Sequence, residues 1–154
     1  MSSELIIETH EEDDCTEYKL TGSIDEDSNF ESISVAKNQI VFNLEEVSLI
    51  NSCGIREWIK FQDTIDINCK ISYKNCPQII VEQMNIIKGF VRSGGNIVSF
   101  FAPYYDEKSD TEIKKLIKPI DVIDGKAPIF KNDDGALLEF DDIEAQYFNF
   151  LKNA

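Results

Sequence analysis

The stretch QIVFNLEEVSLINSCGIREWIKFQDTI, from Gln39 to Ile65, decides how this chain folds. Its first part, residues 40–44, is a short apolar run whose length and β-branched content predict a buried strand. Its last part predicts an amphipathic helix of the kind that lies against a sheet. The apolar side of that helix carries Ile55, Trp58, Ile59, Phe61 and Ile65, and the charged side carries Arg56, Glu57, Lys60 and Asp63.

The turn between this strand and this helix carries the first functional candidate. Residues 47–54 must leave the sheet and start the helix, which puts Ser52 near the helix N-terminus. Unpaired backbone N–H groups and the positive end of the helix dipole meet there. Two interpretations stay open: Ser52 is a helix-capping serine, the commoner case, or it is a serine whose phosphorylated form this position stabilises.

Composition and charge restrict the class of partner. The chain has 154 residues, enough for one ordinary domain with a modest appendage, and a formal net charge of −14. A strongly acidic surface repels nucleic acid and anionic lipid, so we expect protein partners, no nucleic acid and no membrane.

No apolar run is long enough to cross a bilayer, and the first residues do not form a signal peptide, so we expect a cytoplasmic protein. The four cysteines, Cys15, Cys53, Cys69 and Cys76, form no C-x-x-C pair, and there is a single histidine. We therefore expect reduced thiols, no metal site and no cofactor.

Strands and helices alternate along the first two thirds of the chain. Strands at 5–8 and 18–22 flank an acidic turn and predict a hairpin, and a weak helical pattern of Phe30, Ile33 and Val35 follows from about residue 28. After the central strand and helix come a strand at 69–73, a helix that starts at Pro77, and a strand at 96–102. Helical crossovers imply a partly parallel sheet, hence a mixed α/β fold.

The rest of the chain departs from this alternation. We expect a strand over residues 113–122, a hairpin turn at 131–135 followed by a strand at 136–140, and a terminal helix that starts at Asp141 or Asp142. The predicted organisation is a first domain over residues 1–102 and a β appendage with a C-terminal helix over residues 103–154, packed on the same body. The residues that would dock this terminal helix are Ile143, Tyr147, Phe150 and Leu151.

The segment Asn43 to Ile55, NLEEVSLINSCGI, resembles the signature of STAS domains, the family of bacterial anti-sigma factor antagonists. In that family a hydrophobic strand leads into Asp-Ser-Ser/Thr/Ala-Gly-Leu/Ile, and an earlier Leu-x-Gly-x-Leu/Ile-Asp pattern corresponds to Gly22 and Asp25 here. The resemblance covers about the first hundred residues. It implies a four- to five-stranded mixed sheet backed by helices, and no catalytic activity.

The same resemblance implies a regulated partner contact. The serine that matches Ser52 is phosphorylated by an anti-sigma factor that is itself a kinase, and phosphorylation releases that partner because added negative charge disrupts the interface. Two residues depart from the family pattern: Asn51 replaces an acidic residue, and Cys53 replaces Ser, Thr or Ala. The expected partner-binding residues are Asp25, Asn51, Ser52, Cys53, Gly54 and Arg56.

The appendage is similar to a STAS-like subgroup from predatory and gliding bacteria that carries a zinc ribbon. The similarity rests on Cys76-Pro77, on residues 102–105 and on residues 138–142. Cysteine pairs would be expected after the two tyrosines and before the last strand, but residues 106–110 and 131–135 contain none. The resemblance therefore implies a metal-free remnant of the ribbon that serves as a packing or partner surface.

Three functions compete at this point. The first is a regulatory switch that binds a kinase-type anti-sigma factor or a signalling ATPase through Ser52. The second is a constitutive partner, like the STAS-like subunits of lipid-transport ABC systems. The third and weakest is an enzyme built on Cys53 with His10, Glu57 or another acid. We expect Cys53 to be a small buried thiol under the helix. We also expect six apolar residues to belong to the core: Trp58, Phe61, Ile86, Ile87, Tyr104 and Tyr105. Any of these six that is exposed beside Ser52 would anchor a partner.

Overall fold

The computed structural model describes residues 4–33, 35 and 38–153 and has a mixed α/β fold with two sheets. The first sheet has five strands in the order β1-β2-β3-β4-β5. These strands are β1 (Ile6–Glu11), β2 (Thr16–Ile24), β3 (Gln39–Ile50), β4 (Lys70–Lys74) and β5 (Asn96–Ile97). Only β1 runs antiparallel to its neighbour; the other pairs are parallel, and one helix lies between β3 and β4 and another between β4 and β5. The expected mixed α/β class and the N-terminal hairpin are confirmed.

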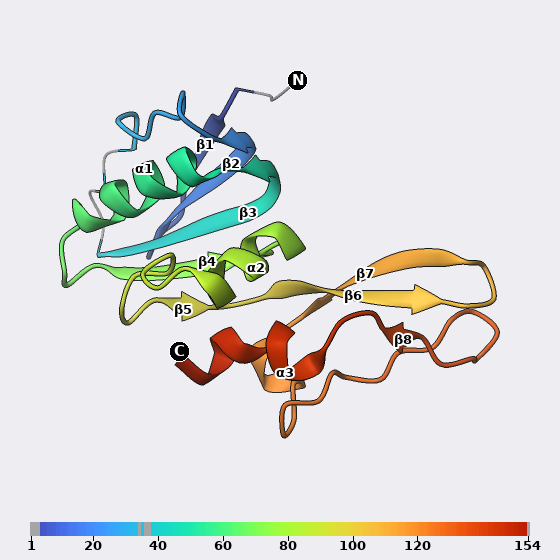
Figure 1. Cartoon of the computed structure of the whole chain (residues 1–154). Helices are drawn as coiled ribbons and strands as arrows, with labels where there is room; N and C mark the ends of the chain where they lie inside the picture. Colours follow the sequence, from blue (N-terminus) through green and yellow to red (C-terminus); the bar gives the residue numbers. More distant parts are fainter. Residues whose placement is uncertain (1–3, 34, 36–37, 154) are drawn as a thin grey trace.

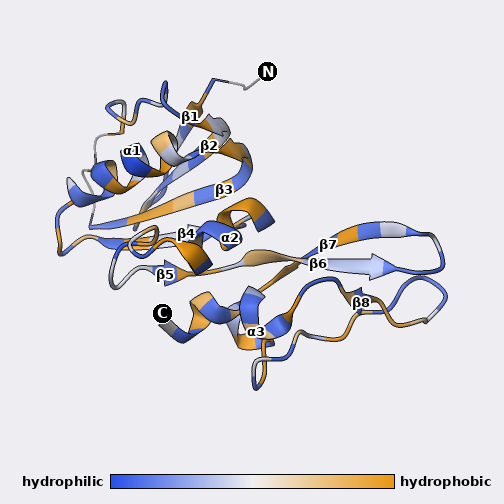
Figure 2. Cartoon of the chain, viewed as in Figure 1, coloured by the Kyte–Doolittle hydropathy of each residue, from blue (hydrophilic) through white to orange (hydrophobic). Residues whose placement is uncertain are grey.

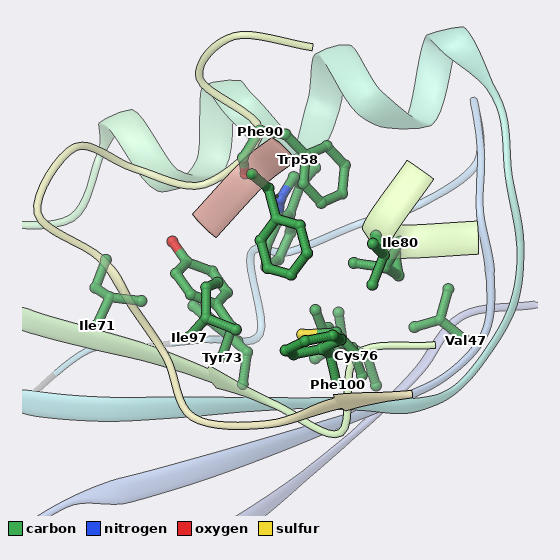
Figure 3. Close-up of a cluster of buried hydrophobic side chains, with 14 of the residues drawn as sticks. Val47, Trp58, Ile71, Tyr73, Cys76, Ile80, Phe90, Ile97 and Phe100 are labelled. Atoms are coloured by element: carbon green, nitrogen blue, oxygen red, sulfur yellow. Dashed lines mark hydrogen bonds between the residues drawn. The ribbon is translucent and has the colours of Figure 1, made fainter. Parts of the chain in front are cut away.

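Helices α1 (Ser52–Asp63) and α2 (Gln78–Ile86) lie on the same side of this sheet (Figure 1). Along α1, hydrophobic and hydrophilic residues alternate in the way expected for a helix with one face on a core (Figure 2). The core between the helices and the sheet is rich in aromatic rings, with Trp58 from α1 completely buried above Tyr73 of β4 and beside Phe90 (Figure 3). The other face of the sheet is polar: Glu17 and Lys74 form an ion pair there, and Asn43 is half-buried.

Three expectations about these elements were wrong. The helix predicted to start at about residue 28 does not form over residues 28–33. These residues make a turn instead, in which the Ile33 N–H donates to the Phe30 carbonyl at 3.0 Å, and Phe30 and Ile33 are buried. The next part of that predicted helix includes residues 34, 36 and 37, which lie outside the described residues. Strand β3 continues to Ile50, six residues beyond the predicted end. Pro77 is the N-cap of α2 and not its first helical residue.

The predicted strand over residues 96–102 is two strands that belong to different sheets. Residues 96–97 pair with β4, whereas β6 (Phe100–Asp106) is the middle strand of a second, antiparallel sheet with the order β7-β6-β8. The break lies at Ser99, whose hydroxyl accepts the Asn75 backbone N–H at 2.9 Å and donates to the Asn75 side-chain oxygen at 3.1 Å. The predicted division at residue 102 therefore falls inside β6.

The second sheet and the C-terminal helices form the appendage. Its other strands are β7 (Thr111–Ile117) and β8 (Glu139–Phe140), and a 3-10 helix, η1 (Pro119–Asp121), follows β7. The chain ends with α3 (Glu144–Tyr147) and the 3-10 helix η2 (Asn149–Asn153). Helix α3 is N-capped by Ile143, so the predicted start at Asp141 or Asp142 was wrong; Ile143 is 59% exposed, whereas Tyr147 and Phe150 are buried.

The appendage is attached to the first sheet through α2. The Asn85 side-chain amide donates to the Tyr147 carbonyl at 3.0 Å, and its oxygen accepts the Phe150 N–H at 2.7 Å. Phe100 at the start of β6 packs edge-on against Phe150 and Phe148. Figure 1 shows α3 lying below β5 and β6, while the β6–β7 hairpin extends away from the rest of the molecule.

Candidate partner-binding site at the start of helix α1

Ser52 is the first residue of α1, directly after the central strand β3. The N-cap is Asn51, whose side-chain oxygen accepts the Gly54 N–H at 2.9 Å, so the expectation that Ser52 caps the helix was wrong. Asparagine is among the best N-cap residues because its short side chain reaches the N–H groups of the first turn. With the cap supplied by Asn51, the Ser52 side chain is exposed to solvent.

Gly54 brings the start of α1 against the end of β2. A Cβ atom at this position would lie 2.0 Å from the Ile24 carbonyl oxygen, which is impossible without moving the backbone. The Asn51 N–H donates to the same carbonyl at 3.1 Å. This contact therefore requires glycine, and it fixes the position of Ser52 relative to the sheet.

A hydrogen-bonded turn follows β2 beside the start of α1. The Asp25 carboxylate accepts the Asp27 N–H at 3.0 Å, and the Asp25 N–H donates to the Ser28 hydroxyl at 2.8 Å. Asp25 itself is only 7% exposed. Its role in this structure is to shape the turn, as Asp side chains commonly do.

Glu26, at the exposed tip of this turn, contacts the cap of α1. The Asn51 side-chain N–H donates to Glu26 Oε2 at 2.9 Å, and this hydrogen bond is the main reason that the pKa of Glu26 is lowered. A carboxylate near the N-terminus of a helix is also favoured by the helix dipole. Sequence reasoning missed Glu26, because nothing in an acidic, turn-rich segment marks one carboxylate among several.

The predicted partner-binding residues divide into surface and support. Ser52, Cys53 and Arg56 are exposed, and Asn51 is half-buried. Asp25 and Gly54 are buried, so a partner cannot reach either residue directly, and they act by holding the turn and the helix in place. The prediction that Cys53 is buried was wrong, because residue 53 lies on the solvent side of the first helical turn.

One apolar residue is exposed next to this surface. Leu49, near the end of β3, is 42% exposed. The apolar residues considered as anchors lie elsewhere: Trp58 and Tyr104 are buried, and Ile86, which is 73% exposed, lies at the end of α2. Among the described residues, Leu49 is therefore the exposed large apolar residue nearest to Ser52 along the chain, three positions before it.

A catalytic pair of Cys53 and His10 cannot form in this fold. His10 pairs with Glu17 near the start of β2, whereas Asn51 pairs with Ile24 at its end. Seven residues of strand separate these two points, about 23 Å at the usual rise of about 3.3 Å per residue. Glu57, the other acid considered, lies 3.8 Å from Lys60 in an ion pair on the helix surface.

The opposite end of α1 is fixed by a buried polar network that the sequence did not reveal. Gln62 lies on the buried side of the helix, where its side-chain N–H donates to the Phe90 carbonyl at 2.8 Å and its side-chain oxygen accepts a hydrogen bond from the Tyr73 hydroxyl. The Arg92 guanidinium donates to the carbonyls of Ile65 and Asp66, both at 2.6 Å, and so caps the chain just after α1. Burial raises the pKa of Tyr73, which keeps the phenol protonated.

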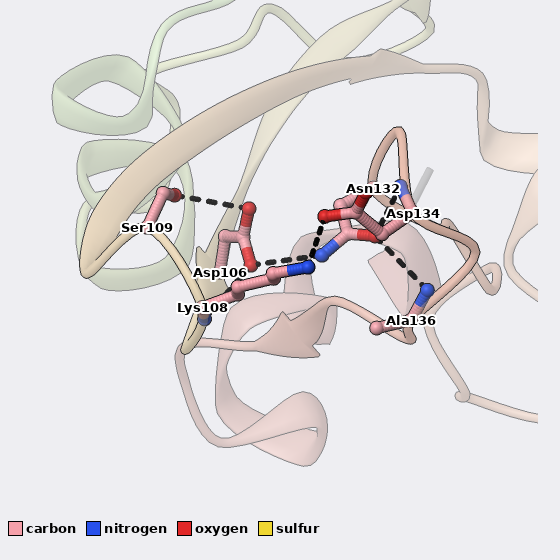
Figure 4. A network of polar contacts seen from close by, with 6 residues as sticks. All are labelled: Asp106, Lys108, Ser109, Asn132, Asp134 and Ala136. Carbon is pink, nitrogen blue, oxygen red and sulfur yellow. Dashed lines mark hydrogen bonds and ion pairs between the residues drawn. The ribbon is translucent and has the colours of Figure 1, made fainter.

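A second polar network joins residues 106–109 to residues 132–134, in the two loops where the resemblance to a zinc ribbon predicted cysteines that this sequence lacks (Figure 4). The Asp106 carboxylate accepts hydrogen bonds from the Lys108 N–H, the Ser109 hydroxyl and the Asn132 side chain, at 3.1, 3.0 and 3.1 Å. Lys108 also pairs with Asp134 at 2.6 Å. Among the residues that the structure describes, no group of three or more Cys, His, Asp or Glu side chains is arranged to hold a metal. We call the residues Asp106, Lys108, Ser109, Asn132 and Asp134 the loop clasp.

Each helix in the described ranges is too short or too polar to span a lipid bilayer. No protein-family model, no curated protein and no solved structure matches this chain.

Proposed function

We propose that this chain is a non-catalytic protein-binding module of the anti-sigma factor antagonist type, with Ser52 at its contact surface. The observation that carries the proposal is the exposed Ser52 hydroxyl at the first position of α1, directly after the central parallel strand. Solvent exposure makes the hydroxyl accessible to a kinase, and the helix N-terminus favours an added phosphate.

The proposed partner is an anti-sigma factor that is a serine kinase, or a similar cytoplasmic signalling ATPase. Phosphorylation of Ser52 would end the contact, because nearly two negative charges on an interface cost both repulsion and desolvation. The contact surface consists of Asn51, Ser52, Cys53 and Arg56 with Leu49 at its side. We refer to these five residues as the α1 surface.

A second candidate function is a constitutive partner subunit that is not phosphorylated. Asn51 favours this alternative, because the acidic residue of the kinase-linked members is absent. Both functions use the α1 surface, and they differ only in whether charge at residue 52 ends the contact.

Affinity capture from lysate of the source cells tests the proposal. We expect the unmodified protein and Ser52→Ala to retain the same ATP-binding partner, and Ser52→Glu to retain at least about tenfold less, corresponding to about 1.4 kcal/mol. Ser93→Glu is the matched control, because Ser93 is exposed and follows α2, near the other end of α1.

Full retention by Ser52→Glu together with loss in Arg56→Glu would replace the switch with the constitutive function. Retention of the partner by both of these variants would show that the α1 surface is not the contact. Intact-mass measurement of the protein from its native cells, before and after phosphatase treatment, gives a separate check on modification of Ser52.

A further inference from the structure

Glu26 and Ser52 contribute to one small surface, although 25 residues separate Asn51 from Glu26 in the sequence. Asn51 joins them: its side-chain N–H donates to Glu26 Oε2 at 2.9 Å, and its peptide bond leads into Ser52. The Asn51 side-chain oxygen is used by the Gly54 N–H. A phosphate on Ser52 would therefore add negative charge next to Asn51, the residue whose side chain holds the Glu26 carboxylate.

The turn that carries Glu26 is held by local hydrogen bonds, one of them from the Ser28 hydroxyl to the Ser23 carbonyl at 3.2 Å. Three backbone N–H groups within it are hydrogen-bonded locally: Asp25 to the Ser28 hydroxyl, Asp27 to the Asp25 carboxylate, and Ser28 to the Asp25 carbonyl at 3.1 Å. Glu26 and Asp27 are exposed. The hydrogen bond from Asn51 to Glu26 connects the tip of this turn to α1.

We propose that phosphorylation of Ser52 releases the turn of residues 25–28 from the start of α1. The inference rests on the proposed function, in that Ser52 is taken as the modified residue. In the modification the γ-phosphoryl group of a nucleoside triphosphate is transferred to Ser52 Oγ, the diphosphate leaves, and the hydroxyl proton passes to solvent. The new group carries a charge of about −1.5 to −2 at neutral pH.

We expect Glu26, and not the phosphate, to leave the start of α1, because the phosphate has stronger partners there than Glu26 has. The positive end of the helix favours an added phosphate, although the Gly54 N–H is already donated to Asn51, and Arg56 lies one turn along the same side of α1. Glu26 has the Asn51 amide and is repelled by the phosphate. Loss of that hydrogen bond frees the tip of the turn, so the modification changes the shape of the α1 surface as well as its charge.

Hydrogen exchange on protein that carries phosphoserine at position 52 tests this proposal. Phosphoserine is inserted during translation, so no kinase is needed, and NMR follows the amides of Asp25, Asp27 and Ser28. We expect exchange at these amides to be at least about threefold faster than in the unmodified protein. In 1 M salt, where the Debye length is about 3 Å, the difference should shrink.

Two matched proteins make the result specific. Glu26→Gln keeps an oxygen that can accept the Asn51 amide but removes the charge, so phosphoserine 52 should leave exchange in the turn unchanged in this variant. Phosphoserine at position 93 should not affect the turn. The Val98 amide, which donates to Tyr73 at 2.8 Å in the core sheet, should remain slow in every protein and reports that the fold is intact.

Unchanged exchange at all three amides, or equal acceleration in Glu26→Gln, overturns the inference. Partner capture measured on the same phosphorylated protein distinguishes failure of this inference from failure of the proposed function. If phosphoserine 52 abolishes partner capture but leaves the turn unchanged, the turn does not respond and the switch stands. If the turn is released but capture continues, the inference stands and the switch fails.

Discussion

Gly54 lies so close to Ile24 that a Cβ atom on it would meet the Ile24 carbonyl oxygen at 2.0 Å. The atoms that such a Cβ would strike are backbone atoms at the end of β2, which cannot rotate away as a side chain can. The distance between β2 and the first turn of α1, and with it the placement of Ser52, therefore depends on the absence of a side chain at residue 54.

Substitution of Gly54 by alanine should lower the free energy of unfolding by about 2 kcal/mol or more, since overpacking of this kind costs about 1–3 kcal/mol. Urea denaturation followed by Trp58 fluorescence measures the change. Ser52→Ala, two residues away at an exposed position, should change stability by less than about 0.5 kcal/mol. Equal stability of the two variants would mean that α1 can move away from β2 at no cost.

Removal of the Arg92 side chain should destabilise the protein by about 2 kcal/mol, because a charged donor to several carbonyls is lost at once. Arg92→Lys should recover less than half of this loss, since an ammonium group cannot reproduce the planar fork of the guanidinium. Thermal unfolding of Arg92→Ala, Arg92→Lys and the surface control Arg56→Ala gives the comparison. An unchanged midpoint in Arg92→Ala would contradict the capping role.

The loop clasp should weaken in acid. Hydrogen bonds from Asn132, Ser109 and Lys108 hold the pKa of Asp106 below its ordinary value. A lowered folded-state pKa contributes stability that is complete above the unfolded pKa of about 3.9 and is lost as the pH falls through the folded value. We therefore expect the contact between the two loops to weaken progressively as the pH falls below about 4.

NMR titration of the Asp106 carboxyl and of the loop amides from pH 6 to pH 2 measures this loss. In Asp106→Asn the amides of residues 132–136 should no longer respond to this titration, since the carboxylate has been removed. A folded-state pKa at or above the ordinary value would show that the clasp does not favour the charged form.

The cysteines should react with a thiol reagent in an order set by burial. Cys53 is exposed, whereas Cys76 is completely buried and burial raises the pKa of its thiol. At pH 8, Ellman's reagent should modify Cys53 quickly, and Cys53→Ser should remove that fast reaction. Cys76 should react only at the rate of unfolding. Rapid modification of Cys76 in the folded protein would contradict its placement in the core.

The sequence pattern predicted the elements of the first sheet because their periodicity and burial agree. Residues 40–44 are apolar at every position facing α1, and Trp58 marks the buried side of the helix that follows. The end of β3 was missed because residues 45–50 pair with β2 across two shifts in register. These shifts break the alternation of buried and exposed side chains that identifies a strand in a sequence. The backbone hydrogen bonds of the ladder, and not the side-chain pattern, define that end.

The separation of β5 from β6 could not be read from the sequence. Residues 96–102 form a continuous run with one polar residue, Ser99, in the middle. The break depends on contacts between Ser99 and Asn75, 24 residues earlier, and on the positive φ of 54° at Asn75. Such distant side-chain pairs leave no local signal.

The candidate site was predicted in outline, and its hydrogen bonds were not. The strand-to-helix turn was located, but Asn51 and not Ser52 caps the helix, and the contact with Glu26 was missed. A capping asparagine and a capping serine are almost equivalent in propensity, so only the backbone geometry decides which of two neighbours begins the helix.

Because β6 begins three residues after β5 and Asn85 of α2 is bonded to the last two turns of the chain, the appendage has no hinge of its own. A protein cut after residue 102 would end within β6, and Phe100 would lose its contacts with the rings of Phe148 and Phe150. The two sheets should consequently melt together as one cooperative unit, and shortened versions of this protein would mislead whoever used them to search for binding partners.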